Sequence, residues 1–207
     1  LIKHGKVFII PLVKPTYSRL LLLFAAVIPL IFTAGCALGN TDVAFSVYPD
    51  DIVEQVKVNV RSAKLYRDLD TILIADILWY KPELKRKRLI ELSKKGRITA
   101  DEKMKMLAEI DKKESAEIEF IAGFYTGEKK WNDFDSDSSV WKIRLEADDG
   151  TLVAPSGIEK LDLKKMPDSY HFTFLTPWKS AYRIIFAKKG KLSRLKSHKI
   201  VLRSILG

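Results

Sequence analysis

The chain has 207 residues, with 36 basic and 26 acidic side chains and a formal net charge of +10 at neutral pH. This length suits a single domain with one core, or one core and a small appendage. Its one cysteine excludes an internal disulfide and a cysteine-rich zinc site.

The N-terminal segment has the proportions of a signal peptide. An apolar run of 13 residues, Leu20 to Phe32, falls within the range of a signal-peptide h-region, whereas a membrane-spanning helix needs about 20 apolar residues. The stretch before this run carries no acidic side chain and is basic at Lys3, Lys6, Lys14 and Arg19. We therefore expect residues 1–35 to be a signal peptide that is removed on export.

Directly after the run, Thr33-Ala34-Gly35-Cys36 resembles the lipobox of bacterial lipoproteins, in which small residues precede a cysteine that is diacylated on its thiol. Thr33 stands where leucine is usual. The resemblance implies cleavage before Cys36 and a covalent diacylglycerol lipid on it, and two or more acyl chains give stable membrane anchoring. The alternative is an ordinary secretory signal, cleaved at an A-x-A-like site, with Cys36 unmodified.

These features predict a bacterial cell-envelope protein held to a membrane by its lipid anchor. Ala37 follows the cysteine, whereas an aspartate at that position resembles an inner-membrane retention signal. The outer membrane, facing the periplasm, is therefore favoured where the host has one. Residues 36–50 are expected to be the lipidated N-terminus and a tether, and residues 51–207 the folded domain.

Residues 56–80 have the pattern of a β-hairpin. Apolar residues alternate at Val56, Val58 and Val60, and Arg67-Asp68-Leu69-Asp70 has the character of a turn. The residues that follow, 71–80, are rich in β-branched and aromatic side chains. The pattern predicts strands near 56–66 and 71–79.

The periodicity becomes helical after residue 81. Pro82 suits the first position of a helix, and Lys94-Lys95-Gly96 is a basic last turn followed by a glycine stop. Thr99 and Glu102 form a capping box ahead of apolar residues at helical spacing. Two helices, at about 82–95 and 100–117, are therefore expected to form an αα-hairpin.

From residue 119 the strand pattern returns. Trp141, Ile143 and Leu145 alternate with charged residues, and Asp148-Asp149-Gly150 turns the chain into 151–153. Further strands are expected near 120–126, 157–163, 171–175, 181–187 and 198–206. We therefore predict an α+β fold: an antiparallel β-sandwich with the αα-hairpin, at about 82–117, inserted between strands of one sheet.

Several aromatic and turn motifs resemble, in their order, an uncharacterised group of bacterial lipoproteins with an immunoglobulin-like sandwich. They are Tyr66-Arg67-Asp68-Leu69-Asp70-Thr71, Trp131-Asn132-Asp133-Phe134-Asp135, Trp141 ahead of Asp148-Asp149-Gly150, and Phe174-Leu175-Thr176-Pro177-Trp178. The resemblance implies an immunoglobulin-like fold and an envelope location. It brings no known catalytic residue.

The C-terminal stretch is strongly basic, with nine basic residues and no acidic one from Ser169 to Gly207. Nucleic acid is the usual partner of such a patch in the cytosol, but an exported protein rarely meets it. We expect contact with an anionic envelope surface or with envelope proteins instead. The candidate residues are Lys188, Lys189, Lys191, Arg194, Lys196 and Lys199. The alternative is a solvated strand face and loop.

Alternating carboxylates at Asp133, Asp135 and Asp137 are weak candidates for a Ca²⁺ site, because this ion binds oxygen ligands. An EF-hand register fails, since starting at Asp135 places Val140 where the loop needs glycine. The alternative is a polar connection whose Asp and Ser side chains cap their own backbone.

The motifs do not indicate catalysis. Only His171 and His198 follow Cys36, and neither a Gly-x-Ser-x-Gly nor a His-Glu-x-x-His motif is present. Trp131 and Trp178 lie in turn contexts and are candidates for ligand contact. We predict a non-catalytic binding or assembly component; the alternative is a calcium- or glycan-dependent enzyme or sensor that uses the 131–139 loop.

Overall fold

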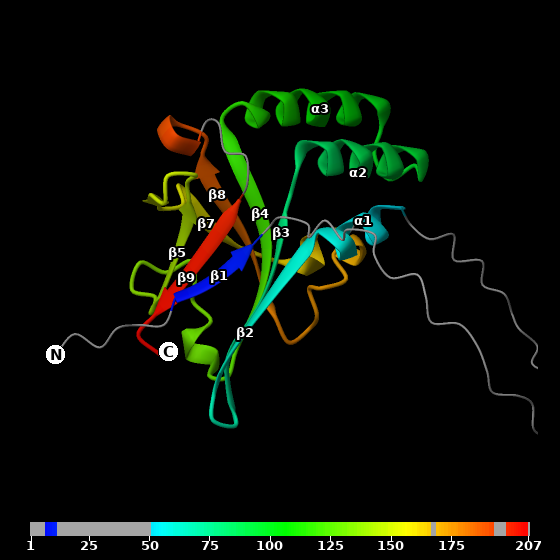
Figure 1. Cartoon of the computed structure of the whole chain (residues 1–207). Coiled ribbons are helices and arrows are strands. Elements are labelled where there is room, and N and C mark those ends of the chain that lie inside the picture. Colours follow the sequence, from blue (N-terminus) through cyan, green and yellow to red (C-terminus); the bar gives the residue numbers. More distant parts are fainter. Residues whose placement is uncertain (1–6, 12–50, 167–168, 193–197, 207) are drawn as a thin grey trace, which may run out of the picture. The chain divides into compact units, whose positions relative to one another are not determined.

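The computed structural model describes residues 7–11, 51–166, 169–192 and 198–206 of the chain (Figure 1). Within them it has an α+β fold with two antiparallel sheets and three α-helices. Cys36, Arg194 and Lys196 lie outside the described residues, as does most of the expected signal peptide.

The larger sheet has five strands and the smaller has four. The larger runs in the order β2 (Val60–Arg67), β3 (Asp70–Trp79), β4 (Glu117–Thr126), β8 (Ser180–Ala187) and β7 (Gly157–Leu161). The smaller runs in the order β1 (Val7–Pro11), β9 (Lys199–Ser204), β5 (Trp141–Glu146) and β6 (Leu152–Val153). All the pairings are antiparallel.

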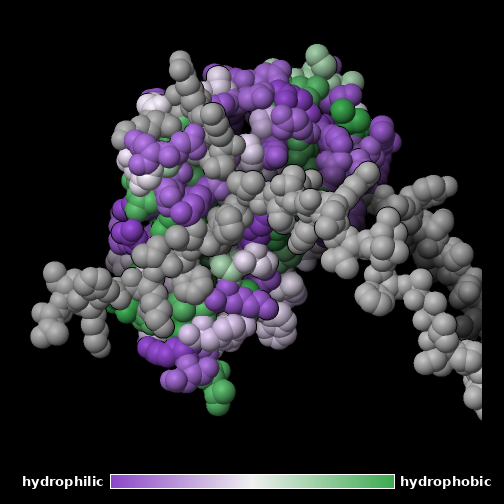
Figure 2. All heavy atoms as spheres, viewed as in Figure 1, coloured by the Kyte–Doolittle hydropathy of each residue, from purple (hydrophilic) through white to green (hydrophobic). Residues whose placement is uncertain are grey.

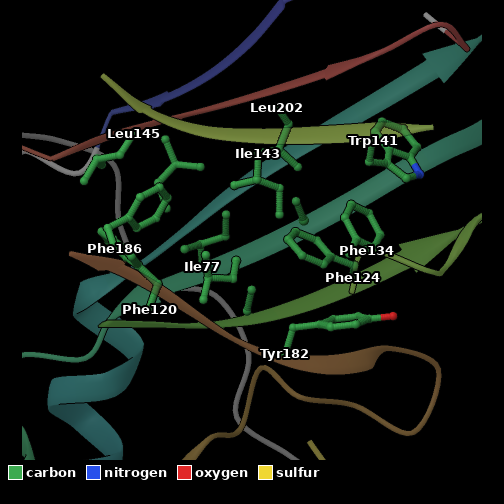
Figure 3. Packing of buried hydrophobic residues seen from close by; sticks show 14 of the residues in the cluster. Ile77, Phe120, Phe124, Phe134, Trp141, Ile143, Leu145, Tyr182, Phe186 and Leu202 are labelled. Carbon is green, nitrogen blue, oxygen red and sulfur yellow. The ribbon is translucent and has the colours of Figure 1, made fainter. Parts of the chain in front are cut away.

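The two sheets pack face to face around one hydrophobic core (Figure 3). Trp141, Ile143 and Leu145 of β5 are buried in it while Lys142 is exposed, which confirms the strand phase predicted from their alternation. The ring of Phe134 stacks between two others, with its centroid 4.0 Å from that of Phe124 and 5.5 Å from that of Trp141. These contacts tie the loop before β5 to both sheets.

The inserted helical hairpin is confirmed. Helices α2 (Pro82–Lys94) and α3 (Ala100–Glu114) lie side by side and connect β3 to β4, which are neighbours in the larger sheet (Figure 1). At the start of α3, Thr99 and Glu102 make the reciprocal hydrogen bonds of the predicted capping box. Gly96 ends α2 with a φ of +64°, a conformation that glycine adopts without strain.

A second hydrophobic cluster covers the opposite face of the larger sheet. Leu78 and Ile121 of that face contact Leu84 of α2, and Ile52 and Val56 of the short helix α1 (Asp51–Asn59) join them. The central strands of the larger sheet, β3, β4 and β8, are therefore largely buried.

One predicted strand is wrong and another began too early: of the strand predicted near 56–66, residues 60–66 lie in β2 and only 56–59 do not. Residues 51–59 form α1, because Ile52 and Val56 lie one helical turn apart and both are buried, whereas Val58 is exposed. Residues 171–175 are not a strand: His171 ends the 3₁₀-helix η3 (Ser169–His171), and residues 172–175 follow it in tight turns. There Phe172 and Leu175, three residues apart, pack into the second cluster.

Three other short 3₁₀-helices lie in connections: η1 (Lys129–Trp131), η2 (Leu163–Lys165) and η4 (Gly190–Leu192). Among the described residues, no helix combines the length and the apolar character that crossing a membrane requires.

Strand β1 was not expected, because its residues fall within the expected signal peptide. It pairs with β9 from Val7 opposite Arg203 to Pro11 opposite Lys199. Strand β9 therefore lies between β1 and β5.

Candidate functional site

The sandwich has two distinct ends. One end carries the turn of the β2–β3 hairpin, and we call it the hairpin end. The end of β4 and the start of β8 lie there as well, since Phe124 pairs with Ser180. The end of β9 lies there too, because Ser204 pairs with Trp141, which reaches Phe124 through Phe134. At the opposite end, the helix end, β4 begins at Glu117, β8 finishes and the αα-hairpin joins the sheet.

Large apolar side chains are exposed at the hairpin end. Leu69 at the tip of the β2–β3 turn is 100% exposed, Ile205 after β9 is 85% exposed and Trp178 before β8 is 81% exposed. Hydrophobic atoms are visible at the tip of the hairpin in Figure 2. These three are the most exposed large apolar side chains in the described part of the chain. Exposed apolar groups that gather on one surface are typical of interaction sites.

The turn that carries Trp178 is held to the sheet by its neighbour. The Lys179 ammonium pairs with the buried Asp76 carboxylate of β3 and donates to the Phe174 carbonyl oxygen at 3.1 Å. The Ser62 hydroxyl donates to the same carboxylate. Because the Asp76 carboxylate is buried, the Lys179 ammonium is half-buried and both are partnered, the turn has a defined position, and the Trp178 indole is presented to solvent.

Trp131 lines a groove at the same end. The groove, of about 340 Å³, also has Tyr125, Arg67 and Leu69 in its wall. The Lys130 ammonium lies 4.8 Å from the centroid of the Trp131 ring. Gly127 lies so close to the hairpin that a Cβ atom there would stand 2.3 Å from the Thr71 carbonyl oxygen, so only glycine fits.

The 132–139 loop uses its polar groups to hold itself in place. Asn132 donates to the Phe124 carbonyl at 2.9 Å, and its own carbonyl accepts from the Tyr182 hydroxyl at 2.7 Å. Burial raises the pKa of Tyr182 to about 12, so this hydroxyl stays protonated as the donor. Asp133 accepts from the Ser139 hydroxyl at 3.0 Å.

The carboxylates proposed for Ca²⁺ are not gathered around a common point. Asp135 and Asp137 are exposed, while Asp133 is engaged with Ser139. Within the described ranges, no three histidine, cysteine, aspartate or glutamate side chains come together as a metal site requires. The arrangement is that of side chains capping a turn.

At the helix end, His198 lines a cavity of about 360 Å³ together with carboxylates. Glu83, Glu114 and Glu117 lie in the wall, as do Trp79 and Lys188. Burial lowers the pKa of His198 to about 4, with Lys81 and Lys188 adding to the effect. Its imidazole is therefore neutral at physiological pH.

The two histidines lie on opposite sides of the larger sheet. His198 contacts the rings of Trp79 and Phe120, which belong with the sandwich core. His171 is fully buried beside Tyr170, next to the second cluster. The structure therefore does not bring them together.

The basic residues singled out in the sequence are partly engaged. Lys188 donates to the Glu114 carbonyl oxygen at 3.2 Å, and Lys199 pairs with Glu146 at 2.9 Å. Lys189 is exposed. All three lie at the helix end, away from Trp131 and Trp178. The side chain of Lys191 is outside the description, as are Arg194 and Lys196.

One partly buried charge cluster gave no signal in the sequence. Glu119 of β4 pairs with Lys85 of α2 and with Arg183 of β8, at 3.2 Å from the Arg183 Nε atom. These residues line a cavity of about 160 Å³ between the helices and the sheet. Only the folded arrangement shows that they meet.

Comparison of the chain with known family models, curated proteins and solved structures found no match. The site is therefore interpreted from its own geometry.

Proposed function

We propose that this protein is an envelope lipoprotein, acylated at Cys36 and cleaved before it so that residues 1–35 are lost, that acts as a non-catalytic binding or assembly component. The hairpin end is the surface that contacts its partner. The observation that carries the proposal is that Leu69, Trp178 and Ile205, all at this end, are the most exposed large apolar side chains in the described part of the chain. The alanine after the cysteine favours the outer membrane as the site of anchoring.

The Trp178 turn has the properties of an interface anchor. Tryptophan is enriched among the residues that contribute most to binding energy, and an anchor held in place before binding loses less conformational entropy. The buried Asp76–Lys179 pair supplies that restraint. Burying the indole against a partner would gain about 1.5–3 kcal/mol by the hydrophobic effect alone.

A binding role also fits the chemistry of the His198 cavity. A general base works best when its pKa lies near the working pH. His198, with a pKa of about 4, is a weak base at neutral pH. The same cavity holds Lys188 in a hydrogen bond to the backbone of α3. These features favour structural roles for the polar groups at the helix end.

We also infer an immunoglobulin-like topology for the sandwich. In immunoglobulin domains one sheet has the strand order A-B-E-D, and in the other strand C lies between F and C′. Here β3-β4-β8-β7 and β9-β5-β6 follow the same orders and the same sequence of crossings between sheets. Strand β2 and the αα-hairpin are additions to this frame.

The lipoprotein chemistry provides a sharp test of the proposed surface. Once Cys36 is acylated, a cysteine introduced at Leu69 is the only free thiol in the chain. We would attach a thiol-specific photo-crosslinker there and irradiate the processed protein in its own envelope. Leu69→Cys should give a discrete protein adduct, which Trp178→Ala reduces severalfold.

Met104→Cys is the matched control, since Met104 is an exposed apolar residue of α3, away from the hairpin end. The proposal fails if both positions give the same adducts, or if position 69 labels only lipid.

The alternative, a calcium- or glycan-dependent enzyme or sensor that uses the 131–139 loop, is favoured by one observation. Trp131 and Tyr125 line the same groove, and aromatic faces are common contacts for sugars. Soluble cell-wall oligosaccharides should then quench tryptophan fluorescence in the wild type and not in Trp131→Phe. A dependence of that quenching on Ca²⁺ would favour the sensor.

A further inference from the structure

The cavity between helices α2 and α3 and the larger sheet has the features of a ligand site. Its volume is about 160 Å³, and it lies on the opposite side of that sheet from His198. We infer that it binds a small carboxylate with a compact apolar body. The carboxylate lies at the Tyr80 hydroxyl, and the apolar body lies against α3.

The sheet gives the cavity a charged floor because side chains alternate along a strand. Glu119 of β4 and Arg183 of β8 line the cavity, whereas their neighbours Phe120 and Ile184 belong to the sandwich core. The Glu119 carboxylate pairs with Arg183 and also with Lys85 of α2. This carboxylate therefore already has two cationic partners within the wall.

Tyr80 supplies a hydrogen-bond donor to the cavity. It lines the wall and is only 6% exposed. Its oxygen accepts from the Arg88 guanidinium, and a tyrosine hydroxyl that accepts one bond still has its own proton to donate. Among the described residues this proton has no acceptor. Buried polar groups are rarely left unsatisfied, so an oxygen of the ligand is expected there.

The hydroxyl keeps this proton at neutral pH. Burial raises the pKa of Tyr80 above its ordinary value, even though the neighbouring Arg88 acts in the opposite direction. Tyr80 is therefore a neutral donor, and an anionic oxygen is the acceptor that forms the stronger hydrogen bond with it.

The charges around the cavity also favour an anion. Its half-buried charged side chains comprise three basic and two acidic ones: Lys85, Arg88, Arg183, Glu117 and Glu119. The other two charged residues of the wall, Glu109 and Lys113, are exposed and opposite in sign. Glu159, the second partner of Arg183, is exposed and lies outside the wall. Because partly buried charge is unfavourable without a counter-charge, a ligand with one negative charge balances the set.

The remaining wall is apolar and includes the underside of α3. Leu89, Met106, Ile110 and Ile185 line it. Helix α3 is described throughout and none of its residues is buried, so a ligand held against Met106 and Ile110 would cover apolar groups that the fold leaves open. An engineered cavity of about 150 Å³ binds benzene. The apolar body of the ligand is therefore about the size of one aromatic ring.

A titration with para-fluorobenzoate, followed by fluorine NMR, tests the site. The purified full-length chain in a neutral detergent should bind this probe with a Kd of about 1 mM or tighter, a value usual for a ligand of so few atoms. Micelles alone give the blank. The uncharged para-fluorobenzyl alcohol has the same ring and should bind about tenfold more weakly, because it lacks the charge-assisted hydrogen bonds. Equal binding of the two compounds, or no binding of the carboxylate, would overturn the inference.

Tyr80→Phe tests the assigned donor, since it removes the hydroxyl and keeps the ring. It should weaken the binding of para-fluorobenzoate about fivefold or more. Tyr125→Phe is the matched control, because Tyr125 lines the groove at the hairpin end, and it should bind as the wild type does. Urea unfolding of both variants checks that they are folded. A folded Tyr80→Phe protein with unchanged affinity would refute the assignment.

Ile110→Trp tests the place of the apolar body. Ile110 is half-buried on α3, so a larger side chain there should fill the cavity without unfolding the domain, and binding should be lost. Met104→Trp puts the same side chain on an exposed part of α3 outside the wall and should leave binding unchanged.

Hydrogen–deuterium exchange of residues 100–114 provides a second readout of the same site. Para-fluorobenzoate should slow exchange of α3 in the wild type and in Met104→Trp, because a ligand that binds only the closed form stabilises it. It should have no effect in Ile110→Trp. Binding that persists in Ile110→Trp would show that the probe lies elsewhere and would overturn the inference.

Discussion

The imidazole of His198 packs against the indole of Trp79, with 3.8 Å between the ring centroids. This burial lowers the pKa of His198 to about 4, below the value of about 6.5 for an unfolded chain. Between these two values the unfolded state binds the proton and the folded state does not, so the free energy of unfolding falls as the pH is lowered. The loss should reach about 3 kcal/mol at pH 4.

Denaturant titrations at pH 7 and pH 4 would measure this loss, with His198→Gln as the comparison. The variant should be less stable at pH 7 but should lose less on acidification, because its side chain takes up no proton. Identical pH profiles for the two proteins would show that His198 is not the titrating group.

The phase of β5 predicts a sharp contrast between adjacent positions. Ile143 is 2% exposed in the sandwich core, so Ile143→Asp buries an unpaired charge and should cost several kcal/mol of a total of about 5–15 kcal/mol. Lys142 is exposed, and Lys142→Glu should change stability by about 0.5 kcal/mol or less. Urea unfolding followed by tryptophan fluorescence would test both, and comparable losses would contradict the strand phase.

The Asp76–Lys179 pair should behave as a coupled unit. Lys179→Met leaves the Asp76 carboxylate buried with the Ser62 hydroxyl, and it should destabilise the domain by about 3–5 kcal/mol. Asp76→Leu combined with Lys179→Met should cost much less than the two single losses added together. A double-mutant cycle by chemical denaturation gives the coupling energy, and simple additivity would argue against a buried pair.

Acylation of Cys36 predicts a loss of processing when the thiol is removed. Cys36→Ala should accumulate as an unprocessed precursor and incorporate no labelled palmitate. Metabolic labelling and intact-mass spectrometry of the envelope fraction would show this. An ordinary secretory signal would instead give a processed, unlabelled protein that is released without detergent.

The basic C-terminal stretch should bind anionic membranes in a salt-dependent way. Charges more than about 8 Å apart are largely screened at physiological ionic strength, so binding should weaken between low and physiological salt. Replacing Lys188, Lys189 and Lys191 with glutamate should abolish vesicle binding in the unlipidated domain. The control replaces three lysines elsewhere with glutamate and makes the same change in net charge; they are Lys105, Lys112 and Lys129. If both triple variants lose vesicle binding equally, the loss reflects net charge alone.

Elements with a local signal could be predicted from the sequence. The capping box of Thr99 and Glu102 needs only residues three apart, and the alternation of Trp141, Ile143 and Leu145 identifies its own buried face. The αα-hairpin and β5 were therefore predicted correctly. Their bounds differ from the structure by a few residues at most.

The errors occurred where one pattern suits two structures. Val56, Val58 and Val60 alternate as in a strand, but the pair Ile52 and Val56 also suits a helix, and packing against Leu78 and Tyr80 decides for the helix. A short apolar run cannot distinguish these alternatives by periodicity alone.

The candidate site was only partly accessible to sequence reasoning. Trp131 and Trp178 could be picked out because each follows or precedes turn residues. The restraint on Trp178 could not, because Asp76 and Lys179 lie in distant parts of the chain and neither is unusual alone. Strand β1 was hidden for another reason, since its residues also have the composition of a leader.

The ring stack of Phe124, Phe134 and Trp141 makes the folded domain independent of thiol chemistry. In antibody domains, which are also β-sandwiches, a buried tryptophan packs against a disulfide that joins the two sheets. Here Trp141 packs on Phe134, which bridges to Phe124 of the other sheet, and the only cysteine of the chain lies before the domain. The domain therefore needs no oxidase to fold, and reductants in its surroundings leave its core intact.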